Sequence, residues 1–392
     1  MLSYPDYKRC LINIISSVTK YYRTPAQYPS LPVLDRELGS YYKNVVLIIL
    51  DGLGADMLKK NSDTDSLLRE HQAAKLTSVF PSSTAAAMTS YYTGVSPNEH
   101  AWIGRSLYFK EFNSTIDIAT NQDSYTQIPF MRSGAASFVM PYETIFKDIK
   151  KSILGNVQPF TIMPKRINLN ESGIFHKTAG DFARGCELIK KICETRQNTF
   201  TFFQWDEPSL TAAKYGCYSP ETAEIIKSIN SELSLLTKDL TDTLFIISSD
   251  HGMIDLEDEV LLHQIPELCE CFTIPPFCEG RAMTFYIKYD KRADFERLFQ
   301  NYFAGDFILL PKRDILGKEI LGTGRTHPKI SDFIGDYMAC AIGTKTLCHR
   351  ILNAKPRKMY LAGHGGFTDL EMEIPLIIIP TKQTLKPSVS IF

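Results

Sequence analysis

Apolar runs of strand length recur along the chain and alternate with longer stretches of helical pattern. Residues 44–50 read Asn-Val-Val-Leu-Ile-Ile-Leu, and similar runs occupy 198–205 and 243–249. Continuous apolar runs of this length are typical of central strands that are covered on both faces. Helical patterns follow at 84–92 and 221–240. This alternation predicts an α/β fold, with a doubly wound, mostly parallel sheet and helices on both of its faces.

The segment from about residue 254 to residue 348 interrupts this rhythm. It combines Pro-rich turns with a strand-like run at 282–288 and a helical pattern at 294–302. A chain of 392 residues also exceeds the usual size of one small core. We therefore expect a core formed by residues 1–253 and 349–392, and a small α+β cap inserted at 254–348.

Other parts of the chain carry weaker patterns. The start of the chain, residues 1–15, predicts an amphipathic first helix, and residues 22–38 predict a surface segment that contains Pro and Tyr. Short apolar runs at 76–80 and 359–362 predict two further strands.

Composition and charge limit the classes of protein and partner. With 44% hydrophobic and 22% charged residues, the chain has the composition of an ordinary globular protein rather than a disordered or fibrous one. A net charge of -1, without blocks of like charge, argues against nucleic acid and anionic membranes as partners. We expect a small-molecule ligand, whereas composition leaves the oligomeric state open.

The chain shows no pattern of a signal peptide or a membrane span. Its first residues contain Asp and Lys, and no run reaches the roughly 18 to 20 apolar residues that a span requires. Nine cysteines, an odd number, are spread widely, which suits reduced thiols better than a disulfide framework. Among them, Cys269, Cys271 and Cys278 match no common zinc template. These observations predict a cytoplasmic protein.

Polar residues follow three of the predicted strands at their carboxyl ends. Asp51 follows the run at 44–50, Asp250 and His251 follow the run at 243–249, and His364 lies between glycines after 359–362. In α/β sheets, ligands bind beyond the carboxyl ends of the strands. We therefore expect these side chains to share one site.

Thr84 adds a hydroxyl group at the start of a predicted helix. A threonine hydroxyl is a weak nucleophile at neutral pH unless a metal, a base or helix-end amides activate it. Asp51, Asp250, His251 and Thr84 together form a suitable ligand set for one divalent ion, which would lower the pKa of the hydroxyl. The alternative is structural, because Asp and Thr at such positions often cap helices.

Taken in order, the motifs of this chain resemble those of a known family. They are Asp51-Gly-Leu-Gly, Phe-Pro-Ser-Ser-Thr84, Thr93-Gly94, Ser-Pro-Asn-Glu-His100, Trp-Asp-Glu-Pro, Ser-Asp250-His251-Gly-Met and Gly-His364-Gly. This order resembles the alkaline phosphatase superfamily and, within it, the type I phosphodiesterase/nucleotide pyrophosphatase-like branch. In that branch the nucleophile lies nine residues before the Thr of the Thr-Gly turn, which selects Thr84 over Ser82 or Ser83.

The resemblance implies an alkaline phosphatase-like core and two zinc-like ions. Asp51, Thr84, Asp250 and His251 would hold the first ion, and an Asp, a His four residues later and His364 would hold the second. At the positions of that Asp and His, this chain carries Ser209 and Ala213. The second site is expected to be incomplete unless Asp206, Glu207 or His327 takes part.

Arg105 is a second departure from the family pattern. It lies 21 residues after Thr84, where diesterase-like members tend to carry an Asn that binds a phosphate oxygen. A guanidinium group matches two phosphate oxygens and suits a terminal phosphate dianion. The alternative is that Arg105 points to solvent.

The sequence thus predicts a metal-dependent hydrolase of phosphoric esters, either phosphodiesters or phosphomonoesters, with Thr84 as the nucleophile. Two alternatives stay open: a non-catalytic protein that binds phosphate ligands, and a phosphomutase. The metal is expected to be zinc, with manganese as an alternative, because mixed Asp and His ligands suit both ions.

Overall fold

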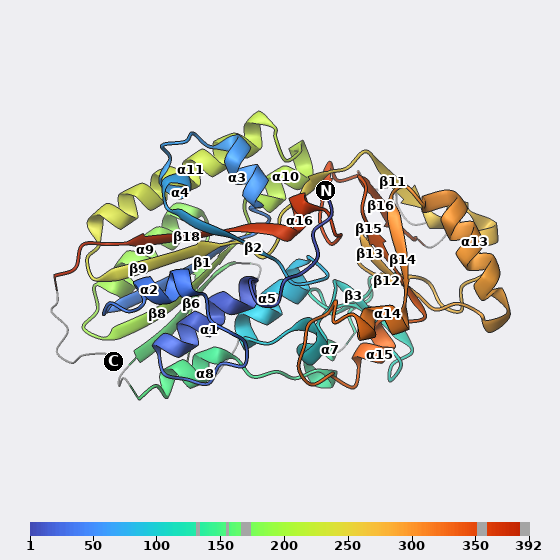
Figure 1. Cartoon of the computed structure of the whole chain (residues 1–392), viewed down its shortest axis with the longest axis horizontal. Helices are drawn as coiled ribbons and strands as arrows, with labels where there is room; N and C mark the ends of the chain where they lie inside the picture. Colours follow the sequence, from blue (N-terminus) through green and yellow to red (C-terminus); the bar gives the residue numbers. More distant parts are fainter. Residues whose placement is uncertain (131–133, 154–156, 166–173, 351–358, 385–392) are drawn as a thin grey trace.

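The computed structural model describes residues 1–130, 134–153, 157–165, 174–350 and 359–384. Within these residues the chain forms two seven-stranded sheets and two short two-stranded ones. The two large sheets lie at opposite ends of the long axis of the molecule, and the amino terminus lies between them (Figure 1).

The first large sheet confirms the predicted α/β architecture. Its order is β2-β18-β9-β1-β8-β6-β7, and the five strands from β9 to β7 run parallel, whereas β18 is antiparallel to both of its neighbours. Its strands are β1 (Asn44–Leu50), β2 (Gln72–Thr77), β6 (Val157–Pro164), β7 (Phe175–Ala179), β8 (Asn198–Trp205), β9 (Thr243–Ser248) and β18 (Glu373–Pro380).

Strand β1 shows why residues 45–50 are all apolar. Val45, Leu47 and Ile49 contribute to one hydrophobic cluster, and the alternate residues Val46, Ile48 and Leu50 contribute to another. Successive side chains of a strand point to opposite faces, so helices must cover both sides of the sheet. On the first face these are α1 (Leu11–Tyr21), α2 (Pro32–Glu37), α5 (Thr84–Thr93) and α8 (Ile145–Lys150). On the second they are α3 (Ala55–Asn61), α4 (Leu67–Glu70), α9 (Phe182–Cys193), α10 (Ser209–Tyr215) and α11 (Pro220–Asp239).

Local sequence signals fix the ends of the longer helices. Helix α11 begins after Ser219, whose hydroxyl accepts a hydrogen bond from the Thr222 N–H at 3.2 Å, and Pro220 occupies its first position. Helix α5 ends at Gly94, which takes the left-handed conformation (φ 71°) that favours glycine. The predicted elements at 44–50, 84–92, 198–205, 221–240 and 243–249 are thereby confirmed within one or two residues.

The second large sheet, here called the cap sheet, has the order β14-β15-β13-β12-β3-β4-β5. Its strands are β3 (Ser106–Phe109), β4 (Ser114–Asp117), β5 (Gln122–Asp123), β12 (Phe277–Cys278), β13 (Ala282–Phe285), β14 (Phe307–Pro311) and β15 (Tyr337–Ala341). Four of these strands fall within 254–348, but β3, β4 and β5 come from 106–123. The division into a core and a cap stays a proposal, and we assign β3, β4 and β5 to the cap. Of the predicted core, residues 131–133, 154–156, 166–173, 351–358 and 385–392 lie outside the described residues.

Helices and short strands complete the region around the cap sheet. Phe295, Phe299 and Phe303, spaced four residues apart on α13 (Arg292–Phe303), pack in one cluster with β13 and β15. A further cluster joins core and cap, and in it the rings of Phe80 and Phe367 stack at 4.0 Å. The remaining helices are α6 (Pro97–His100), α7 (Ala135–Val139), α12 (Pro266–Cys269), α13 (Arg292–Phe303), α14 (Lys312–Gly317), α15 (Ile330–Phe333), α16 (Asp369–Met372), η1 (Leu262–Gln264) and η2 (Tyr289–Lys291). The short strands are β10 (Ile254–Asp255), β11 (Asp258–Leu261), β16 (Lys345–Cys348) and β17 (Ala362–Gly363).

Three of the weaker predictions are wrong in detail. Residues 22–38 do not form a mere surface segment, because Tyr22, Tyr28 and Leu31 are buried against the core. The strand expected at 76–80 is β2 at 72–77, since its pairing with β18 ends at Thr77. The run at 359–362 contributes only to the two-residue β17, which pairs with β10 outside the large sheets.

No helix in the described ranges combines the length and the apolar character that crossing a bilayer requires.

Candidate active site

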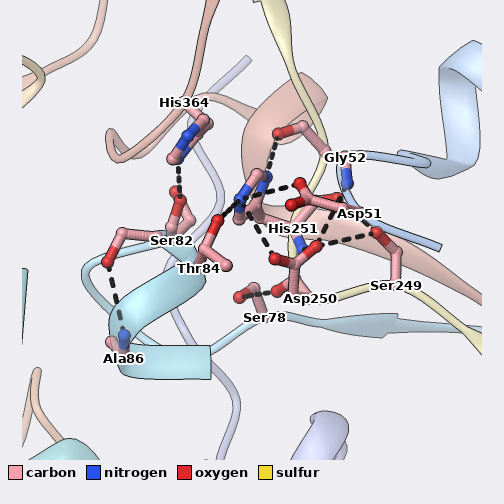
Figure 2. A network of polar contacts seen from close by, with 12 residues as sticks. Asp51, Gly52, Ser78, Ser82, Thr84, Ala86, Ser249, Asp250, His251 and His364 are labelled. Carbon is pink, nitrogen blue, oxygen red and sulfur yellow. Dashed lines mark hydrogen bonds and ion pairs between the residues drawn. The ribbon is translucent and has the colours of Figure 1, made fainter. Parts of the chain in front are cut away.

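The predicted site residues Asp51, Asp250 and His251 lie at the ends of two neighbouring parallel strands. Asp51 follows β1 directly, and Asp250 comes two residues after β9, which pairs with β1 along its length. The carboxyl ends of the two strands therefore bring these side chains to one edge of the sheet (Figure 2).

Glycines next to these residues allow the backbone to pack closely. A Cβ atom at Gly252 would lie 2.0 Å from the carbonyl oxygen of Leu370. Gly52 has a positive φ of 76°, and a Cβ there would lie 2.9 Å from the Cβ of Ser209. Gly52 directly follows Asp51, and Gly252 directly follows His251. The close backbone contacts at these glycines therefore set the positions of the two candidate ligands.

Asp51, Asp250 and His251 form one compact and buried group. One ligand atom from each lies within 4.8 Å of the others, and they are the only such group of three or more in the described residues. The Nε2 atom of His251 is 3.3 Å from Oδ2 of Asp250 and 3.8 Å from Oδ1 of Asp51. A buried imidazole nitrogen thus faces two carboxylate oxygens.

Hydrogen bonds set which nitrogen of His251 can act as a ligand. Its Nδ1 is 2.9 Å from the carbonyl oxygen of Gly252. A carbonyl oxygen only accepts, so Nδ1 carries the proton and Nε2 presents a lone pair. Burial lowers the pKa of His251 to about 4, and the ring is therefore neutral at neutral pH.

The group fits a divalent cation. Oδ1 of Asp250 accepts from the N–H groups of Gly52 at 3.1 Å and His251 at 3.0 Å, whereas its buried Oδ2 finds no hydrogen-bond donor among the described residues. Burial raises the pKa of Asp250, because an uncompensated charge is unfavourable there. A cation bound between Oδ2 of Asp250 and Nε2 of His251 would balance the carboxylate charge and accept the imidazole lone pair. Carboxylate oxygen with imidazole nitrogen is a usual zinc ligand set.

Thr84 stands beside this group at the first position of α5. Its hydroxyl oxygen is 3.1 Å from Nε2 of His251 (Figure 2). The residue as a whole is partly exposed. The preceding residue, Ser83, caps the helix, because its side chain accepts from the Ala86 N–H at 3.5 Å. The structural alternative for Thr84 is thus not observed, and its hydroxyl faces His251 instead.

His364 joins the site from a loop rather than from the end of a central strand. Its ring stacks on that of His251 with 3.7 Å between centroids, and its Nδ1–H donates to the carbonyl oxygen of Ser82 at 3.1 Å. Burial and the neighbouring His251 ring lower the pKa of His364. The structure therefore brings His364 next to the group of three, with its Nε2 free of the proton.

The positions expected for the second metal carry no rebuilt ligand set. Ser209 begins α10, and its backbone N–H donates to the carbonyl oxygen of Asp51 at 2.9 Å. It therefore lies next to a candidate metal ligand. Ala213 follows one helical turn later. Glu207 instead accepts from the Thr211 N–H at 2.9 Å. In the described part of the chain, Asp206, Glu207 and His327 enter no group of three metal-binding side chains.

The structure places Arg105 in an ion pair. Its Nε is 2.7 Å from Oδ2 of Asp117, and 58% of its side chain is exposed, so the guanidinium is accessible but already partly neutralised. Its backbone N–H donates to Oε1 of Glu279 at 2.7 Å. The role of Arg105 as a phosphate ligand stays a prediction.

Sequence reasoning missed a buried ion pair whose Glu371 contacts the loops that carry His251 and His364. Arg281, which directly precedes β13, contacts Glu371 at 2.6 Å and 2.8 Å, and both side chains are buried. Glu371 also accepts from the N–H of Gly366 and the hydroxyl of Thr368. The spacing of Thr368 and Glu371 is that of a capping box, which could have drawn attention to Glu371, but no local pattern indicated Arg281.

Comparison with known proteins agrees with this geometry. The profile of the family described as type I phosphodiesterase / nucleotide pyrophosphatase matches residues 45–274. A search of curated protein sequences found no match.

Several solved structures share the fold. Murine ectonucleotide pyrophosphatase/phosphodiesterase 5 superposes with a TM-score of 0.64 at 16% identity, covering 86% of this chain and 91% of that one. An inactive form of the same murine protein in complex with AMP gives 0.63 at 16% identity, with 88% and 91% covered. Phosphonoacetate hydrolase from Sinorhizobium meliloti, in complex with phosphonoformate, gives 0.62 at 16% identity, with 93% and 95% covered.

At this identity the structural likeness establishes the fold alone. The family profile covers more than half of the chain, including the strand ends that carry Asp51, Asp250 and His251. The chain therefore belongs to the type I phosphodiesterase/nucleotide pyrophosphatase family.

Proposed function

We propose that this protein is a metal-dependent hydrolase of phosphoric esters and that Thr84 is its nucleophile. The observation that carries this proposal is the hydroxyl of the partly exposed Thr84, which lies 3.1 Å from Nε2 of His251, itself grouped with the buried carboxylates of Asp51 and Asp250. Membership of the family supports phosphoester hydrolysis as the class of reaction.

Asp51, Asp250 and His251 would hold one divalent ion, with Thr84 as the fourth ligand. Such an ion supplies Lewis acidity and favours the deprotonated form of the attacking hydroxyl. Oxygen and imidazole ligands in a group of four suit zinc, which we propose as the metal, with manganese as the alternative.

The chain's own residues orient the reaction. Ser83 caps α5 and leaves Thr84 to face His251, while the hydrogen bond from Nδ1 to Gly252 keeps the Nε2 lone pair directed at the site. The amino-terminal end of α5 favours an anion bound beside Thr84, because the helix dipole places partial positive charge there. Arg105 would contribute a further positive charge if the phosphate competes with Asp117 for its guanidinium.

The proposed substrates are small phosphate or phosphonate esters. Proteins of the same fold have been captured with AMP and with phosphonoformate, which supports a small-molecule substrate. We also retain the cytoplasmic location as a proposal, since all nine cysteines lie in described segments and are free thiols.

A non-catalytic, phosphate-binding role is the second candidate. Ser209 and Ala213 favour it, because they occupy the positions where the family pattern places ligands of a second ion. In two-metal sites one ion stabilises the attacking oxygen and the other the leaving oxygen, so this chain would lack half of that arrangement.

The test is hydrolysis of aryl phosphate monoesters and diesters by zinc-loaded and manganese-loaded protein. Thr84→Ala is expected to lower kcat/KM on the order of 1,000-fold or more, because removal of a nucleophile removes the whole pathway. Thr89→Ala is the matched control, since Thr89 lies in the same helix and its hydroxyl only bonds the backbone of Ala85. Turnover that survives Thr84→Ala would contradict the proposal.

Ser209→Asp combined with Ala213→His separates the two candidates. If the scaffold is otherwise competent, the double change raises turnover and the number of bound ions. Absence of any turnover in both forms, together with binding of a phosphate ester measured by calorimetry, would favour the non-catalytic role.

A further inference from the structure

The hydroxyl group of Ser249 lies between the two strand ends that carry the candidate metal ligands. Its Oγ is 2.7 Å from the carbonyl oxygen of Leu50, the residue before Asp51, and 2.6 Å from the carbonyl oxygen of His251. It is also 3.3 Å from Oδ1 of Asp250 (Figure 2). One fully buried side chain therefore contacts both of the segments from which the three ligands project.

This contact continues the link between β1 and β9 beyond the sheet itself. The backbone register of the two strands ends at the pair formed by Ile49 and Ser248. The contact between Ser249 Oγ and the Leu50 carbonyl lies one residue further along both segments. A side chain thus joins the two segments at the residue before Asp51, where the parallel ladder has ended.

The backbone of Ser249 is tied to the helix that carries Thr84. Its carbonyl oxygen accepts a hydrogen bond from the Tyr91 hydroxyl at 2.9 Å, and Tyr91 is buried on α5, seven residues after Thr84. Seven residues correspond to about two helical turns, so Tyr91 and Thr84 lie on the same side of the helix. Ser249 is therefore in contact with β1, with the turn after β9 and with α5, which together present all four candidate ligands.

Loss of the Ser249 hydroxyl would disturb the backbone at His251. A serine hydroxyl has one proton, and the carbonyl oxygens of Leu50 and His251 both lie within its reach. The Leu50 carbonyl has a second donor, the N–H of Leu53 at 3.2 Å. His251 is fully buried, and loss of a hydrogen-bonding contact by a buried carbonyl is unfavourable. Without the hydroxyl, the turn is expected to relax and to move Nε2 of His251 relative to the carboxylates.

We propose that Ser249 is a positioning residue of the metal site, and that its hydroxyl sets the spacing of Asp51 from Asp250 and His251. This inference rests on the metal site of the proposed function. Alanine at this position keeps a small, buried side chain, so the proposal concerns the hydroxyl group rather than the size of the residue.

The experiment measures zinc affinity and stability separately in Ser249→Ala. Competition with a chromophoric chelator gives the Kd for zinc, which is expected to rise about 10- to 100-fold, as is typical when an outer-shell hydrogen bond is lost. The melting temperature of the metal-free protein, followed by circular dichroism in excess chelator, reports on the fold alone. A merely structural role would lower that temperature and leave the Kd unchanged.

Thr243→Val is the matched control, because it removes a buried hydroxyl that joins the same two strands at their opposite ends. Oγ1 of Thr243, the first residue of β9, accepts from Nδ2 of Asn44, the first residue of β1, at 3.1 Å. Both substitutions should lower the melting temperature of the metal-free protein. Ser249→Ala should weaken zinc binding, whereas Thr243→Val should leave the Kd for zinc at its wild-type value.

The outcomes separate this inference from the proposed function. If the wild type binds zinc and Ser249→Ala binds it equally well, or if Thr243→Val loses as much affinity, the positioning role is refuted while the metal site stands. A Ser249→Ala protein that does not fold without metal would also refute the role, because the hydroxyl would then be needed for the fold. If the wild type binds no zinc, the proposed zinc site fails, and this inference fails with it.

Discussion

Removal of the Arg281 side chain should cost more stability than most single substitutions. Arg281 is 1% exposed and makes two hydrogen bonds to Glu371, at 2.6 Å and 2.8 Å, and two to the carbonyl oxygens of Lys345 and Gly343. Burial acts to raise the pKa of Glu371, but the charge and hydrogen bonds of Arg281, together with the hydrogen bonds from Thr368 and Gly366, lower it overall. Arg281→Met would therefore leave a buried and uncompensated carboxylate.

The structure allows the size of this effect to be bounded. Breaking a buried pair by removing one partner typically costs about 3–5 kcal/mol. Glu371 would keep two donors, the Gly366 N–H at 2.8 Å and the Thr368 hydroxyl at 2.6 Å. Because hydrogen bonds to a charged group are each worth about 1.5–3 kcal/mol, these donors place the expected loss near the lower end, about 3 kcal/mol.

Urea unfolding followed by circular dichroism measures this loss. Glu371→Gln in the Arg281→Met background removes the stranded charge, so the double variant should lose less than the two single changes added together. Arg297→Met is the matched control, since Arg297 pairs with Asp294 on the surface of α13 and such pairs contribute about 0–1 kcal/mol. A loss below about 1 kcal/mol for Arg281→Met, or strict additivity in the cycle, would refute the reasoning.

The same pair should act on the candidate metal site. The backbone carbonyl of Glu371 accepts from the Gly252 N–H at 2.7 Å, and its side chain accepts from the Gly366 N–H, so it holds the loops of His251 and His364. Loss of such outer support typically costs 10- to 100-fold in metal affinity. Zinc titration of Arg281→Met should show a reduction of about that size.

Three further predictions concern the site itself. In the wild type, zinc at about 100 times its Kd should add about 2.7 kcal/mol to the free energy of unfolding. Asp250→Asn should abolish this stabilisation, measured by thermal unfolding with zinc and with a chelator. An equal gain in the variant would contradict the assignment of Asp250 as a ligand. Gly252→Ala should lower the free energy of unfolding by about 1–3 kcal/mol and weaken zinc binding, because its Cβ would lie 2.0 Å from the Leu370 oxygen. Gly305→Ala is the control and should leave stability unchanged, because a Cβ there would meet no atom within 4 Å. Thr84→Ser should retain hydrolysis that Thr84→Ala loses, since serine keeps the hydroxyl, and equal inactivity of both variants in the ester assay would argue against Oγ as the nucleophile.

The sequence predicted those parts of the fold that depend on neighbouring residues. Strand β1 was evident because six consecutive apolar residues, 45–50, leave no polar face, and Asp51 was evident because it follows that strand directly. The juxtaposition of Asp51 with Asp250 also followed from local patterns, since both come at the ends of parallel strands.

Features that depend on distant contacts could not be predicted in this way. Arg281 and Glu371 lie 90 residues apart, and Glu279 reaches Arg105 across 174 residues, so no local period signals either contact. Residues 22–38 lack a clear period, yet Tyr22 and Tyr28 are buried because α1 and α2 pack on the sheet. Burial of such aromatic residues is decided by the assembled sheet rather than by the segment itself.

The most direct test of the account is the zinc content of the purified chain, measured by inductively coupled plasma mass spectrometry on a preparation that is also assayed for ester hydrolysis. The account predicts one ion per wild-type chain with turnover, and a zinc content that falls when Asp250 is replaced by Asn. Two bound ions would show that other residues complete the second site, and active protein without a bound ion would contradict the proposed metal-dependent mechanism.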